Sequence, residues 1–65
     1  MTCCLKSRYI NKHCIDMLIN KELSCFIVRD TELGKIRSQK AYPTEKQAKQ
    51  RYNYLYNKYK KEALI

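Results

Sequence analysis

The chain has 65 residues and a net charge of +8, from 14 Lys and Arg residues against 6 Asp and Glu residues. So short a chain builds a thin core and leaves little room for a deep substrate cleft. These properties argue against an enzyme. They favour a small binding protein that gains stability from a partner or from self-association.

The N-terminal third of the sequence gives the weakest structural signal. Residues 1–8 show no recognisable pattern, so we expect a loose segment ahead of a single domain over residues 9–65. Residues 12–20 fit a strand that places Ile15 and Met17 on one side, but they also fit a short helix. Periodicity does not decide between these structures over so short a run, and both stay open.

No secretory signal and no membrane-spanning run is recognisable, so we expect a cytoplasmic protein with free thiols. The cysteines and the histidine do not have the spacing of a metal site. Cys3-Cys4 and His13-Cys14 are adjacent pairs and Cys25 stands alone, whereas structural zinc sites usually place paired ligands about two to four residues apart. We expect no metal and no cofactor.

We interpret Cys14, Cys25 and His13 as structural residues rather than as ligands or catalytic groups. Cys14 and Cys25 are expected to be small core residues. His13 is expected at the surface or half-buried, because no Asn or Asp is evidently placed to orient it beside a cysteine nucleophile.

The middle of the chain predicts a β-hairpin over about residues 24–42. Residues 24–30 are rich in β-branched and aromatic side chains. Residues 31–34 form the turn, where Gly34 is the one glycine of the chain, and residues 35–42 alternate as the returning strand.

The C-terminal segment predicts a helix over about residues 44–62. Thr44 and Gln47 have the spacing of a capping box. An apolar stripe then recurs at spacings of four, three and four residues, which is one face of an α-helix; it consists of Ala48, Tyr52, Leu55 and Tyr59. The expected fold is α+β, with a small antiparallel sheet of two to three strands packed against this helix.

The positive charge is concentrated in the C-terminal half. Residues 1–34 are nearly neutral, whereas residues 35–61 hold nine cations and the single acid Glu45. Such asymmetry favours a polyanionic partner. On the hairpin, Arg37 and Gln39 are two residues apart and are expected to share one side of their strand, with side-chain types that contact guanine and adenine.

The complete set of expected nucleic-acid contacts covers the hairpin and the polar side of the helix. It consists of Arg29, Lys35, Arg37, Gln39, Lys40, Lys46, Lys49, Lys60 and Lys61. Tyr54 points off the apolar stripe and is expected as an exposed contact aromatic, whereas Tyr52 and Tyr59 are expected in the core.

Residues 25–60 resemble two families of DNA-binding modules. The strand 27–30, the Gly34-Lys35 turn, Tyr42, and Thr44 with Ala48 are similar to features of plant ethylene-responsive-factor domains and of phage integrase arm-binding domains. In those families a three-stranded sheet packs on a helix and its outer face enters the major groove. The resemblance implies that the open side of this hairpin faces DNA.

We therefore expect a non-catalytic DNA-binding accessory or regulatory factor of a phage or other mobile element. The alternative is a small phage-type inhibitor or regulator that binds a host protein, through the hairpin edge or the tyrosine-rich helix. DNA is expected ahead of RNA, and self-association to a homo-oligomer is a further expectation.

Overall fold

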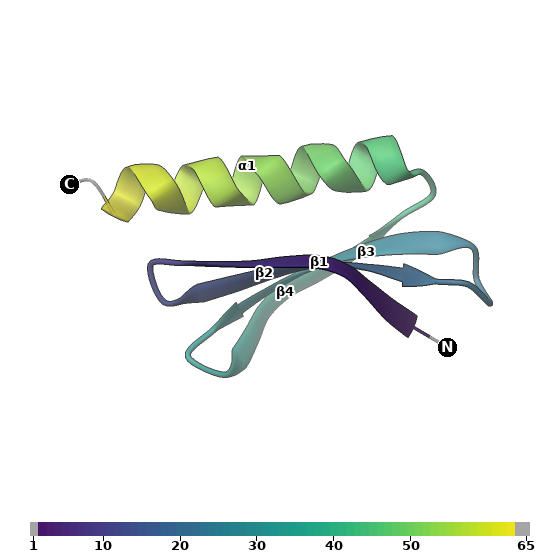
Figure 1. Ribbon diagram of the computed structural model, residues 1–65, viewed down its shortest axis with the longest axis horizontal. Coiled ribbons are helices and arrows are strands. Elements are labelled where there is room, and N and C mark those ends of the chain that lie inside the picture. Colours follow the sequence, from purple (N-terminus) through teal and green to yellow (C-terminus); the bar gives the residue numbers. More distant parts are fainter. Residues whose placement is uncertain (1, 64–65) are drawn as a thin grey trace.

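The computed structural model describes residues 2–63, which form a four-stranded antiparallel sheet and one helix in the order ββββα. The strands follow the chain across the sheet. They are β1 (Thr2–Ile10), β2 (His13–Asn20), β3 (Cys25–Glu32) and β4 (Lys35–Tyr42), and the helix is α1 (Glu45–Ala63). The α1 helix lies along one face of the sheet and makes a two-layer molecule (Figure 1). The α+β class is confirmed, but the sheet has four strands rather than two to three.

The additional strand lies where the sequence predicted a loose segment over residues 1–8. Thr2 begins β1, which pairs with β2 from Thr2↔Asn20 to Ile10↔His13. The strand lacks an apolar alternation because its helix-facing positions include Lys6 and Arg8. Their ammonium and guanidinium groups lie over tyrosine rings of α1 instead of being buried.

In the ambiguous segment 12–20, residues 13–20 form β2, one of the two central strands, and not a helix. β2 pairs with β1 on one side and β3 on the other. Residues 15–18 are all buried, including neighbours that point to opposite faces. Because buried side chains lie on both faces of this strand, burial does not alternate along it, and the alternation that would identify a half-exposed strand is missing.

Two tight turns set the register at one end of the sheet. Asn11 and Lys12 join β1 to β2, and Leu33 and Gly34 join β3 to β4. All four residues have positive φ angles, between 46° and 84°, as two-residue hairpin turns of type I′ require. The amide of Leu33 donates to the carbonyl of Lys12 at 3.3 Å, so the two turns lie against each other.

The α1 helix begins as the sequence predicted. The Thr44 hydroxyl accepts a hydrogen bond from the amide of Gln47 at 3.3 Å, and this caps the first turn. Its predicted apolar stripe is buried and packs on the middle of the sheet. The core consists of Ile15, Met17, Val28, Ala48, Tyr52, Leu55 and Tyr59.

The strand register separates two sides of the sheet. We call the side that carries Ile15, Met17 and Val28 the helix-facing side, because these residues belong to the core under α1. The opposite side, which we call the open face, has no second layer within residues 2–63 (Figure 1). Cys14 alternates with Ile15 onto the open face and is partly exposed, and Cys25 is partly exposed too. Neither belongs to the core cluster, contrary to expectation.

Candidate nucleic-acid interface

The structure distributes the predicted contact residues over two opposite layers. Arg29 and Gln39 are direct partners of adjacent strands and lie on the open face. Lys40 is opposite the core residue Val28, so it is on the helix-facing side, and Lys35 is opposite Glu32 beside the β3–β4 turn. The predicted helix cations, all exposed, belong to the other layer; they are Lys46, Lys49, Lys60 and Lys61. The open face and the outer side of α1 point in opposite directions, so one straight duplex cannot contact the predicted residues on both.

The charge of Arg29 is balanced on the open face by a buried acid. Arg29 donates from Nη2 and Nε to Oδ2 of Asp16, at 3.3 and 3.4 Å. Ser7 donates to the other carboxylate oxygen at 2.6 Å, and the Cys14 thiol donates to it at 3.4 Å. These neighbours bury Asp16 although no second layer covers it. The arginine is therefore held along the sheet in an ion pair.

Arg37 is also paired with an acid, and it lies at an irregularity in β4. The register runs from Asp30↔Ser38 to Thr31↔Ile36, so Arg37 has no partner on β3. Side chains do not alternate strictly between the two faces through such a bulge. The spacing of two residues between Arg37 and Gln39 therefore does not place them on the same side of β4. The Nε of Arg37 donates to Oε1 of Glu32 at 2.9 Å.

The α1 helix carries more cations than acids, and most of these cations are exposed. The helix contains six Lys and Arg residues and two acids, Glu45 and Glu62. Lys49, Tyr56 and Lys60 follow one another at spacings of seven and four residues, so they share one stripe beside the buried face. Lys46 and Lys61 lie farther round, on the side away from the sheet.

Two cations of β1 extend this stripe, and neither was among the contacts predicted from the sequence. The guanidinium carbon of Arg8 lies 4.8 Å from the ring centroid of Tyr56, and the ammonium of Lys6 lies 4.9 Å from that of Tyr52. These are cation–π distances. The alternating pattern Lys6-x-Arg8-x-Ile10 was the available signal. We call the set Lys6, Arg8, Lys49 and Lys60 the α1–β1 surface.

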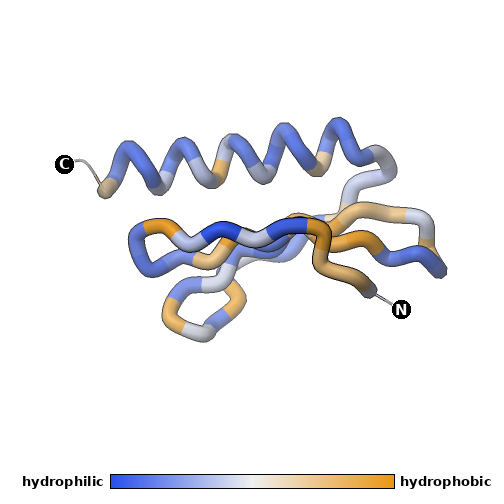
Figure 2. The backbone as a smooth tube through the Cα atoms, in the orientation of Figure 1, coloured by the Kyte–Doolittle hydropathy of each residue, from blue (hydrophilic) through white to orange (hydrophobic). Residues whose placement is uncertain are grey.

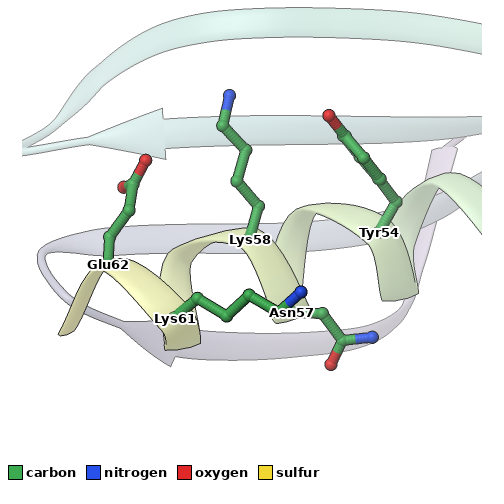
Figure 3. A pocket seen from close by; sticks show the side chains of 5 residues that line it. All are labelled: Tyr54, Asn57, Lys58, Lys61 and Glu62. Atoms are coloured by element: carbon green, nitrogen blue, oxygen red, sulfur yellow. The ribbon is translucent and has the colours of Figure 1, made fainter. Parts of the chain in front are cut away.

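The other flank of α1 is less suited to a polyanion. An open hollow there is lined by Tyr54, Asn57, Lys58, Lys61 and Glu62. The side chains of Tyr54, Lys58 and Glu62 project in the same direction from α1 (Figure 3). Glu62 thus adds a negative charge beside the lysines. Tyr54 is exposed, as predicted, but the guanidinium carbon of Arg51 lies 5.3 Å from its ring centroid and covers one ring face.

A buried polar cluster joins the helix to the sheet. Asp30 accepts hydrogen bonds from His13 Nδ1, at 3.0 Å, and from the hydroxyl of Tyr59. The second ring nitrogen of His13 lies 3.3 Å from Oε2 of Glu32. His13 is buried, contrary to the expected surface or half-buried position. Its two nitrogens face two carboxylates of β3. Burial and then the hydrogen bond to Asp30 raise the pKa of Tyr59 above its usual value.

Residues 2–63 contain no group of three or more His, Cys, Asp or Glu side chains arranged to hold a metal ion. Within the same range, no helix combines the length and apolar character that a membrane crossing requires.

No family model, curated protein or solved structure matches the chain.

Proposed function

We propose that this protein binds nucleic acid through the α1–β1 surface and that its main contacts are to backbone phosphates. The observation that carries the proposal is that two predicted contact arginines of the sheet are paired with acids, whereas the predicted lysines of the helix are exposed. Arg29 on the open face and Arg37 in the bulge are each paired with an acid of the sheet. Lys49 and Lys60 are exposed on the helix, which has six cations and two acids.

The cation–π contacts support this location of the interface. Lys6 and Arg8 lie over tyrosine rings of α1. These contacts hold the two positive groups beside the helix through aromatic rings rather than through acidic side chains. Cations held in fixed positions lose less side-chain entropy when they meet phosphates. The resemblance noted above implies contact through the open face instead, and the two assignments make different predictions for mutants.

DNA duplex is the first partner to test, because the tyrosine rings under and beside the α1–β1 surface are unsuited to stacking on bases. Tyr52 is buried, and the ring of Tyr56 has the Arg8 guanidinium over it. Recognition of single strands depends strongly on exposed aromatic platforms, whereas cations alone suffice to contact the duplex backbone.

The test is the affinity for a random-sequence DNA duplex across a salt series, measured by fluorescence anisotropy. Four phosphate contacts predict that the logarithm of the association constant falls against the logarithm of salt concentration with a slope of about −3.6. A single strand of the same length serves as the competitor. Absence of binding at low salt, or affinity unchanged across the series, would show that the proposal is wrong.

A further inference from the structure

The outer side of α1, away from the sheet, carries a row of amide side chains. Gln50, Asn53 and Asn57 follow one another at spacings of three and four residues, and all three are exposed. At about 100° per residue, they lie on the opposite side of the helix from the buried residues Tyr52 and Leu55. No other element packs on this outer side within residues 2–63 (Figure 1). We call these three residues the amide stripe.

The amide stripe does not serve the fold of the chain itself. Asparagine is a poorer helix former than alanine, lysine or glutamate, because its side chain competes for backbone hydrogen bonds. Asn53 and Asn57 nevertheless lie well inside α1. Among residues 2–63, no side chain of the stripe has a hydrogen-bond partner. A local preference that is broken without a gain in the fold is expected at functional positions, so the stripe is suited to contact with a partner.

The charge around the amide stripe selects a polyanion as that partner. The two acids of α1, Glu45 and Glu62, lie at its ends, so residues 46–61 contain six cations and no acid. Most of the helix is hydrophilic along its length (Figure 2). Lys46 and Lys61 are exposed before and after the stripe. Neutral amides between cations match a DNA groove, where hydrogen-bonding base edges lie between two rows of phosphates.

We propose that the outer side of α1 lies in the major groove of B-form DNA and that the amide stripe hydrogen-bonds to adenine bases. The inference rests on the proposed function and adds base recognition to it. The major groove is about 12 Å wide and admits an α-helix, and asparagine and glutamine pair with the N6 and N7 positions of adenine. From Gln50 to Asn57 the helix rises by about 10 Å, close to three base-pair steps of about 3.4 Å each.

The α1–β1 surface is placed to contact the phosphates along one border of this groove. Lys49 and Lys60 lie between the amide stripe and β1, where the Arg8 guanidinium covers Tyr56. An RNA duplex excludes the same arrangement, because its major groove is deep and narrow. Contacts to phosphates alone would tolerate both duplexes. A preference for DNA duplex over RNA duplex therefore follows from the inference and not from the proposed function.

Selection from a random DNA duplex pool, with sequencing of the bound fraction, tests base recognition. We expect enrichment of adenine within a run of about four base pairs. Replacing the selected adenines with 7-deazaadenine removes the N7 acceptor in the major groove and leaves the minor groove unchanged. This replacement should weaken binding at least about fivefold, as measured by fluorescence anisotropy. An RNA duplex of the same sequence should bind at least about tenfold more weakly than the DNA.

The matched variants are Gln50→Ala on the helix and Gln39→Ala on the open face. Both delete the amide of an exposed glutamine, and alanine favours the helix at position 50. Gln50→Ala and Asn53→Ala should each lower the ratio of affinities for the selected and a shuffled duplex at least about fivefold. Gln39→Ala should leave this ratio unchanged. Far-UV circular dichroism confirms that the variants are folded.

The shuffled duplex separates this inference from the proposed function. Salt-dependent binding without sequence preference, or with equal affinity for the RNA duplex, would overturn the inference and leave the proposed function intact. Binding that is insensitive to 7-deazaadenine would overturn the inference as well. A ratio lowered by Gln39→Ala and not by Gln50→Ala would place base recognition on the open face. Absence of binding to every duplex at low salt would overturn both proposals.

Discussion

The ring of Tyr59 on α1 is stacked on the ring of His13 on β2, with 3.6 Å between the centroids and 8° between the planes. Both side chains also bind the carboxylate of Asp30 on β3, which is 2% exposed. One buried acid thus connects the helix with the two central strands. A buried carboxylate needs such partners, because leaving it unpaired lowers the free energy of unfolding by about 3–5 kcal/mol.

The first prediction removes one of these partners. Tyr59→Phe keeps the ring over His13 and deletes the hydroxyl that donates to Asp30. We expect the free energy of unfolding to fall by about 1–3 kcal/mol, as measured by urea denaturation at neutral pH. Tyr54→Phe is the control, because Tyr54 is exposed and should change stability by less than about 0.5 kcal/mol. Equal effects of the two substitutions would contradict the assigned role of the Tyr59 hydroxyl.

The second prediction concerns alkaline pH. Burial and the hydrogen bond to Asp30 raise the pKa of Tyr59 in the folded state above its ordinary value of about 10. The stability that this shift contributes is complete below the unfolded pKa and is lost as pH rises through the folded pKa. Above about pH 10 the wild type should therefore lose stability faster than Tyr59→Phe, by up to about 1.4 kcal/mol per pH unit.

Urea denaturation of both proteins from about pH 8 to about pH 11.5 measures this difference. Lysines and the other tyrosines titrate in both proteins, so their contributions largely cancel. The advantage of the wild type over Tyr59→Phe should narrow as pH rises. Parallel stability curves over this range would show that the folded and unfolded states ionise Tyr59 alike.

Much of the fold was predictable because its signals are local. The spacing of Ala48, Tyr52, Leu55 and Tyr59 predicts one buried helix face, and the structure buries all four. Thr44 caps the helix at the predicted place. These features depend on neighbours within the same segment and need no knowledge of the tertiary structure.

The candidate site was less predictable, because it depends on which strands meet. The alternation of Lys6, Arg8 and Ile10 was a weak strand signal, because two of the three helix-facing positions carry charged rather than apolar side chains. Arg29 has Asp16 as its ion-pair partner, which is 13 residues away along the chain. The bulge at Arg37 also interrupts the alternation on which its orientation was predicted.

The third prediction concerns a second tyrosine of the same helix. Tyr52 is fully buried, and its hydroxyl has no hydrogen-bond partner among residues 2–63. Tyr52→Phe removes an unsatisfied polar atom and keeps the ring under the Lys6 ammonium. We expect stability to be unchanged or increased by up to about 1 kcal/mol, opposite in sign to Tyr59→Phe. Urea denaturation measures it, and a loss of more than about 1 kcal/mol would indicate that the hydroxyl is bonded.

The fourth prediction decides which layer contacts nucleic acid. Arg8→Gln removes a cation of the α1–β1 surface, so it should weaken duplex binding and reduce the magnitude of the salt slope by about 0.9. The matched control is Arg29→Gln, because the charge of Arg29 is already paired with Asp16. It makes the same substitution on the open face, retains a donor for Asp16, and should leave the slope unchanged. Anisotropy titrations of both variants provide the slopes, with circular dichroism as the check on folding. A reduced slope for Arg29→Gln, together with an unchanged slope for Arg8→Gln, would place the contact on the open face and show that the α1–β1 assignment is wrong.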